Sequence, residues 1–230
     1  MRISGLLFIS QILLLSCGQN SDQKQLYQHE DNVYEVVDTV MEFTSKTHSS
    51  AAIPTGYTRI PISGYVPQND IERHLMEDLK LQEDATNNFD YKKIVSFTYP
   101  DYFKYIQTQY PNKTIQEIKK IYEEILAQYL TEKFKRYISV WPEAKRIGYV
   151  VTDIKNRVKE GTGLLYLYEY HTVFYSESDT IFKKEAEYAV CASLNNGGKW
   201  YSTADGIEDI FRVLGISFSK EAIDEVLTKK

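Results

Sequence analysis

Apolar residues along the middle of the chain recur every three or four positions, the spacing of amphipathic helices. The clearest case follows Thr114-Ile115-Gln116-Glu117, a capping box in which the threonine and glutamate side chains each accept a free backbone N–H. It predicts a helix over residues 114–130 with one apolar face, made of Ile115, Ile118, Ile121, Tyr122, Ile125 and Tyr129. Weaker patterns predict three shorter helices before it, beginning near Asn69, Phe89 and Tyr99.

The segment that precedes these helices has two parts. Residues 26–43 repeat apolar side chains at helical spacing and predict a further helix, with acidic residues scattered between the apolar ones. Residues 48–68 contain three prolines and two glycines, which exclude a long helix and leave a loop with a short extended piece at residues 57–60. This connection is longer than ordinary loops, so it either wraps around the main domain or joins it to the first helix.

After Trp141 the apolar spacing changes to every second residue, which indicates β-strands. Strands are predicted over residues 147–154 and 163–175, followed by a return strand after a turn at residues 176–179. A second tight turn at Asn195-Asn196-Gly197-Gly198 precedes the last strand. Two short helices, over residues 207–214 and 219–227, close the chain.

Helices followed by long antiparallel strands predict an α+β domain in which the helices pack on one face of a curved sheet. We expect helix 114–130 to cover the face that carries a row of tyrosines, namely Tyr166, Tyr168, Tyr170 and Tyr188. Glu169 and His171 alternate with these tyrosines, so we expect them on a solvated face, in a charge ladder with Lys183 and Glu185.

The N-terminus has the layout of a secretory signal peptide. Arg2 is followed by an apolar run of about ten residues, from Leu6 to Leu15, which is too short to span a bilayer. The run ends in Leu14-Leu15-Ser16-Cys17, which resembles the lipobox of bacterial lipoproteins. We therefore predict a signal peptide at residues 1–16, lipidation at Cys17 and a polar tether over residues 17–25.

Composition narrows the classes of partner. The net charge of −5 disfavours a nucleic-acid partner. No later apolar run reaches membrane-spanning length, so the lipid on Cys17 is the only membrane anchor that the sequence implies. Cys191 is the one cysteine left after lipidation; it lies in an apolar strand pattern, and we expect a buried, inert thiol.

Two stretches resemble a known family. Residues 90–103, with Thr98-Tyr99-Pro100, are similar to a helix pair of small NTF2-like bacterial proteins of the cystatin-like, cone-shaped type. Gly198-Lys199-Trp200-Tyr201 and Ile210-Phe211-Arg212 are similar to the ending of the same proteins. The resemblance implies an NTF2-like α+β domain at residues 69–230, with residues 26–68 as a helix and connection outside it. The wider superfamily contains isomerases, dehydratases and non-catalytic binding modules, so the fold leaves the function open.

The sequence contains few patterns that are typical of catalytic or metal-binding sites. The four histidines have no metal-ligand spacing, and neither nucleotide-binding nor serine hydrolase motifs occur, so we predict no metal and no cofactor. Glu169 and His171 could form a proton-transfer pair, but the charge ladder is the better explanation. Five tyrosines are candidates to line a pocket for a glycan or a small apolar ligand: Tyr149, Tyr166, Tyr168, Tyr170 and Tyr188.

Two hypotheses of function follow. The first is a non-catalytic lipoprotein of the bacterial cell envelope, on the outer rather than the inner membrane, which binds a ligand or a partner. The alternative is an NTF2-like enzyme of the isomerase or dehydratase type, which would use a carboxylate or a tyrosine in its pocket.

Overall fold

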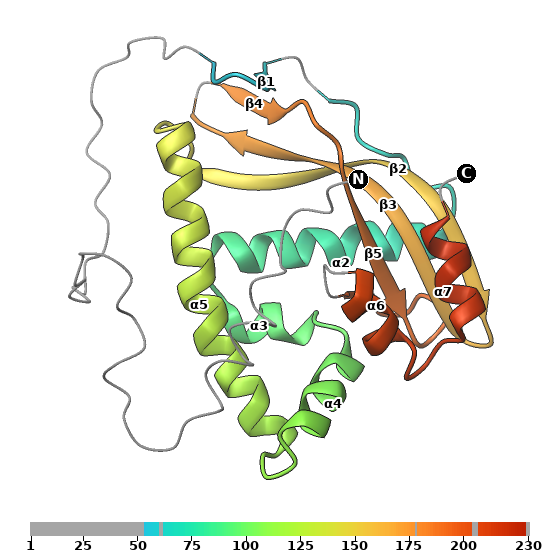
Figure 1. Cartoon of the computed structure of the whole chain (residues 1–230). Coiled ribbons are helices and arrows are strands. Elements are labelled where there is room, and N and C mark those ends of the chain that lie inside the picture. The colour runs from blue at the N-terminus through green and yellow to red at the C-terminus, as the bar shows by residue number, and fades with distance from the viewer. Residues whose placement is uncertain (1–52, 60–61, 178, 204–206, 229–230) are drawn as a thin grey trace.

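The computed structural model describes residues 53–59, 62–177, 179–203 and 207–228. The predicted signal peptide, Cys17, the tether and the helix at residues 26–43 lie outside these ranges. Within them the chain folds into helices and one antiparallel sheet, which confirms the α+β class (Figure 1). The helices are α2 (Asp70–Asn87), α3 (Tyr91–Ser96), α4 (Pro100–Gln109), α5 (Ile115–Val140), α6 (Ile207–Leu214) and α7 (Lys220–Leu227). The strands are β1 (Tyr57–Thr58), β2 (Arg146–Glu160), β3 (Gly163–Tyr175), β4 (Thr180–Lys183), β5 (Glu187–Ser193) and β6 (Tyr201–Ser202).

Strand β3 is the centre of the sheet. On one side it pairs with β2 along its whole length, and on the other side it pairs with β4 and then with β5. The predicted return strand is thus two strands, because residues 184–186 leave the sheet between them. The short strands β1 and β6 extend the sheet beyond β4 and β5. β1 lies within the extended piece predicted at residues 57–60, and its pairing shows that the connection before residue 69 packs on the domain.

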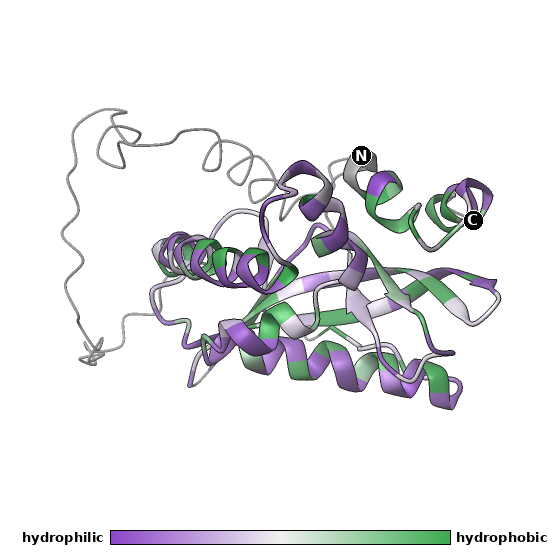
Figure 2. Ribbon diagram, turned by 90° about the horizontal axis from the view of Figure 1, so that it is seen from below, coloured by the Kyte–Doolittle hydropathy of each residue, from purple (hydrophilic) through white to green (hydrophobic). Residues whose placement is uncertain are grey.

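Helices cover both faces of the sheet, so the prediction that they cover one face is wrong. On one face, α2 packs Leu75 against Tyr166 and Tyr168. On the other face, α4, α6 and α7 pack against Leu165 and Leu167. Figure 2 shows the sheet lying between α2 and the C-terminal helices. The physical reason is that both sets of alternate residues in β3 are apolar over residues 164–168, so each face has to be removed from water.

Helix α5 has the predicted start but a different position. Its capping box is present as predicted, and the helix runs ten residues beyond the expected end, to Val140. Its N-terminal half packs with α3 and α4 through Ile118, Tyr122 and Leu126, and it stands beside the sheet (Figure 1). The row of tyrosines is covered by α2 instead, and α5 reaches that face only in its last turns, through Phe134 and Tyr137.

Strand β2 is an edge strand, and side chains of α2 satisfy its outward backbone groups. Asn87 accepts the N–H of Ile147 at 3.0 Å and donates to the carbonyl oxygen of the same residue at 2.7 Å. Glu83 accepts the N–H of Tyr149 at 2.8 Å. These contacts close this part of the edge against pairing with another strand.

Candidate functional site

Four of the five candidate tyrosines lie on the face of the sheet that α2 covers. Tyr149 and Tyr170 meet edge to face with their ring centroids 5.6 Å apart, and Tyr168 follows at 5.8 Å from Tyr170. Tyr166 comes next along β3 and contacts Trp200, at 4.7 Å between centroids. Tyr166 and Tyr168 are buried, whereas Tyr149 and Tyr170 are half-buried. The row therefore runs from a sealed end to an accessible end.

The fifth tyrosine, Tyr188, lies on the opposite face, because it pairs in register with Glu169 rather than with its neighbours in the row. Its hydroxyl donates to Glu169 at 2.9 Å. Lys155 donates to the same carboxylate at 3.0 Å and also pairs with Asp153. The prediction that Glu169 lies on a solvated face is wrong, because its side chain is only 18% exposed. Burial raises the pKa of Glu169, but hydrogen bonds from Lys155, Tyr188 and Thr152 outweigh burial and hold that pKa below its ordinary value.

His171 has partners other than Glu169. Its Nδ1 lies 2.9 Å from the carbonyl oxygen of Lys183, which makes that nitrogen the donor, and its ring meets Phe182 edge to face at 5.6 Å between centroids. The side chain is half-buried rather than exposed. Glu169 and His171 thus have separate structural roles, and the contacts of neither residue assemble the proton-transfer pair considered above.

The accessible end of the tyrosine row is part of a larger group of residues, which we call the tyrosine cluster. Its members come from β1, α5, β2, β3, β4 and β5: Tyr57, Tyr137, Tyr149, Tyr170, Lys183 and Glu187. The ammonium group of Lys183 donates to Glu187 at 2.7 Å, and the phenol of Tyr170 lies close enough to the same carboxylate for its charge to raise the pKa of Tyr170. Residues far apart in the chain therefore place four phenol rings around one ion pair.

Burial fixes the protonation of these phenols. It raises the pKa of Tyr170 well above the ordinary value, and the nearby carboxylate of Glu187 raises it further. Burial also raises the pKa of Tyr137 to about 12 and the pKa of Tyr57 above its usual range. The phenols of Tyr57, Tyr137 and Tyr170 are therefore protonated at neutral pH and can act as hydrogen-bond donors. Burial lowers the pKa of Lys183, but its bond to Glu187 outweighs this effect, so the ammonium stays charged.

Sequence analysis missed a buried carboxylate, Glu72, whose side chain is 1% exposed. It accepts hydrogen bonds from the hydroxyl of Tyr65 at 2.7 Å, the backbone N–H of Gln68 at 2.8 Å and Nε of Arg157 at 2.9 Å. Arg157 also donates to the hydroxyl of Tyr65 at 2.9 Å, and the backbone N–H of Tyr65 donates to Val151 on the edge of β2. This network, the Glu72 clasp, fixes the segment before α2 onto the sheet and is structural.

The remaining candidates carry no catalytic arrangement. Cys191 is buried, and burial raises the pKa of its thiol above the ordinary value. Within the described ranges, no group of three or more His, Cys, Asp or Glu residues could hold a metal ion. The same ranges contain no helix that is long and apolar enough to cross a membrane.

Comparison with protein-family models, with curated proteins and with solved structures found no match to this chain.

Proposed function

We propose that this chain is a lipid-anchored protein of the bacterial cell envelope whose NTF2-like α+β domain binds a ligand without transforming it. The tyrosine cluster carries the proposal. It is the part of the described structure where several aromatic rings, hydrogen-bond donors and a carboxylate acceptor lie together and are only partly buried.

The chemistry of the cluster favours an uncharged polyhydroxylated ligand such as a glycan. Aromatic faces contact the C–H faces of sugars, and protonated phenols and Glu187 can exchange hydrogen bonds with hydroxyl groups. Lys183 and Glu187 neutralise each other at 2.7 Å, so the cluster has no excess charge to select an ion. A small apolar ligand is the weaker alternative, because it would leave these polar groups without partners.

A binding role accounts for the ionisable groups better than the enzymatic alternative. An isomerase or dehydratase of this kind would need a carboxylate or phenolate poised to accept a proton near neutral pH. The phenols of Tyr57, Tyr137 and Tyr170 have raised pKa values, and the pKa of Glu169 is lowered by its fixed partners. Both shifts move the groups away from the range that proton transfer requires.

Other observations support the proposed lipid anchor and the proposed NTF2-like family. The apolar run that ends at Leu14-Leu15-Ser16-Cys17 supports export and lipidation, with the outer membrane as the proposed location. The order of helices followed by an antiparallel sheet and two short C-terminal helices is compatible with an NTF2-like domain. Neither point depends on the identity of the ligand.

The proposal is tested by titrating the full chain with chitobiose, a neutral disaccharide, while following tyrosine fluorescence and the thermal midpoint. Binding should raise the midpoint with ligand concentration. Tyr149→Ala should weaken binding by about tenfold, which corresponds to about 1.4 kcal/mol. Tyr105→Ala is the matched control, because Tyr105 is a half-buried tyrosine on α4, outside the cluster. Equal weakening by both variants, or saturable proton transfer from a substrate, would contradict the assignment.

A further inference from the structure

An apolar surface lies where α5 passes the junction between α2 and α3. We call it the α5–α3 surface and define it by five residues that are exposed or half-buried: Phe89, Tyr91, Leu130, Phe134 and Ile138. Phe89 is 39% exposed and meets Phe134 edge to face at 5.7 Å and Tyr91 at 6.3 Å between ring centroids. A continuous row of rings therefore reaches solvent at this point.

Phe89 occupies an unusual backbone position. It follows the C-cap of α2 with φ at 53°, in the left-handed region that favours glycine. The N–H of Asp90 donates to Ala85 and the N–H of Phe89 donates to Thr86, which is the hydrogen-bond pattern of a Schellman motif. A glycine would relieve the strain, so the exposed ring is retained at an energetic cost. Residues held in such strained backbone conformations cluster at functional sites, which points to a function for the Phe89 side chain.

We propose that the α5–α3 surface is the docking site for residues 26–43 of the same chain, the segment that the sequence predicts to be an amphipathic helix. In a helix, five residues of this segment lie on one face: Val33, Val36, Val37, Val40 and Met41. An isolated helix of this length is marginal in water and gains its stability by burying such a face against an apolar surface. The α5–α3 surface is an apolar surface of this kind.

The length of the connecting chain permits this contact. Residues 44–52 separate the predicted helix from Ile53, where the described structure begins, and nine extended residues span about 30 Å. The chain then enters β1, whose Tyr57 packs in the same apolar cluster as Phe134. The surface is thus close to the point where the N-terminal segment joins the domain.

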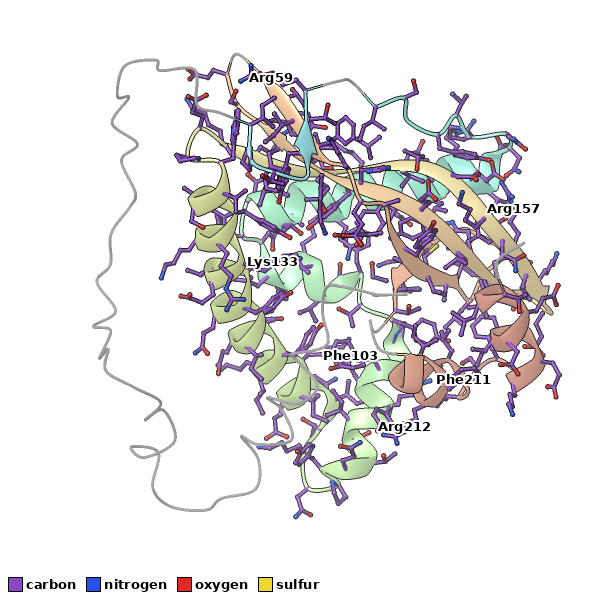
Figure 3. The ribbon with its side chains drawn as sticks, turned by 45° about the horizontal axis from the view of Figure 1, so that its top comes forward. Arg59, Phe103, Lys133, Arg157, Phe211 and Arg212 are labelled. Atoms are coloured by element: carbon purple, nitrogen blue, oxygen red, sulfur yellow. The ribbon has the colours of Figure 1, made fainter. Side chains whose placement is uncertain are left out.

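Charge also favours this occupant. Residues 26–43 contain five acidic residues and no lysine or arginine. α3, which carries one edge of the surface, presents Lys92 and Lys93 as exposed residues, whereas Lys135 on α5 is paired with Glu132 at 3.0 Å. Lys133 lies on the same stretch of α5 (Figure 3). Its ammonium is 5.7 Å from the ring centroids of both Tyr129 and Tyr137. Opposite charges within about 10 Å attract each other at moderate ionic strength.

Hydrogen–deuterium exchange on the full chain tests the proposal. Amides of residues 33–41 should be protected, and Phe89→Ser and Lys92→Glu, the latter at the exposed neighbour of Tyr91, should each raise their exchange rate by about tenfold or more. The matched controls are Ile216→Ser, an exposed apolar residue between α6 and α7, and Lys159→Glu, an exposed residue of β2. Both controls should leave the exchange of residues 33–41 unchanged.

A cysteine pair provides a second readout that does not depend on the stability of the variants. Val37→Cys combined with Phe89→Cys should form an intramolecular disulfide, whereas Val37→Cys with Ile216→Cys should not. Exchange of residues 33–41 at unprotected rates, or protection that both surface variants leave intact, would overturn the proposal. Protection that rises with protein concentration would assign the surface to a second copy, and protection that needs phosphatidylglycerol vesicles would place residues 26–43 on a membrane; either result also overturns it.

Discussion

Tyr168 and His171 are three residues apart on β3, point to opposite faces, and differ in burial. Tyr168 is 8% exposed and lies under α2, so Tyr168→Ala should cost about 3–5 kcal/mol, as for other large buried aromatic residues. His171 is half-buried and has one hydrogen bond and one ring contact, so His171→Ala should cost about 1 kcal/mol. Urea denaturation of both variants measures the difference, and the reverse ranking would mean that the two faces are misassigned.

We expect a clear loss of stability when Glu72 is changed, because its carboxylate is charged and almost fully buried. Glu72→Gln leaves the shape of the side chain but weakens the hydrogen bonds from Arg157 and Tyr65, and should cost about 2–3 kcal/mol at pH 7. Glu77→Gln, at an exposed position of the same helix, is the matched control and should change stability by less than about 0.5 kcal/mol. Urea midpoints that are equal for the two variants would contradict a stabilising role for the Glu72 clasp.

The contribution of Glu72 to the free energy of unfolding changes with pH in a defined direction. Burial raises the pKa of Glu72, but the hydrogen bonds from Gln68, Tyr65 and Arg157 outweigh burial and lower it below the ordinary value. A depressed pKa in the folded state stabilises the protein above the unfolded pKa of about 4.3. This contribution is lost as the pH falls through the folded pKa. The stability difference between wild type and Glu72→Gln should therefore shrink between pH 5 and the acid limit, and a constant difference would exclude titration of Glu72 as its source.

At the scale of elements, the edge of β2 depends on one side chain for two hydrogen bonds. Asn87→Ala would leave both the N–H and the carbonyl of Ile147 without this partner, and should cost about 2 kcal/mol. The neighbouring Asn88 is exposed and bonds only within α2, to Asp84, so Asn88→Ala should cost about 0.5 kcal/mol. Thermal unfolding distinguishes the two, and hydrogen exchange at the Ile147 amide should accelerate only in Asn87→Ala.

Helices and strands that are marked by a capping box or by a clear apolar spacing were predictable from the sequence. The elements that they pack against were not. The Thr114–Glu117 capping box fixed the start of α5, and the alternation of residues 163–175 gave the bounds of β3. The end of α5 was missed because the apolar spacing continues through Leu130, Phe134 and Tyr137, beyond the clearest part of the pattern. Which helix covers the tyrosine row depends on three-dimensional packing that periodicity does not encode.

The same holds for the residues of the candidate site: those grouped by the pattern of one strand were predictable, and those placed by strand register or by long-range contacts were not. The alternation of β3 correctly grouped Tyr166, Tyr168 and Tyr170 on one face. Tyr188 was assigned to that face in error, because a strand pattern does not define the register between two strands. Glu72 carries no local signal at all: its ion-pair partner Arg157 is 85 residues away, and a glutamate in a helix is ordinarily exposed.

At the scale of the whole molecule, residues 53–59, where the described chain begins, lie beside the tyrosine cluster. Tyr57 belongs both to the cluster and to β1, the strand by which the N-terminal segment joins the sheet. The Glu72 clasp then fixes the same segment at the edge of β2, where Arg157 lies on the far side of the molecule from Lys133 on α5 (Figure 3). An anchor at Cys17 would thus connect to the domain through residues that also shape the proposed ligand site.

The anchor itself gives the last prediction. If Cys17 carries the lipid, Cys17→Ser should abolish labelling by a fatty-acid analogue and leave the precursor uncleaved or released from the membrane. Cys191→Ala is the matched control, because Cys191 is buried in the sheet and its loss should not affect labelling. Membrane fractionation and metabolic labelling in a bacterial host measure both effects. Unchanged acylation and fractionation of Cys17→Ser would end the lipoprotein assignment but would not affect the ligand titration, which depends only on the folded domain.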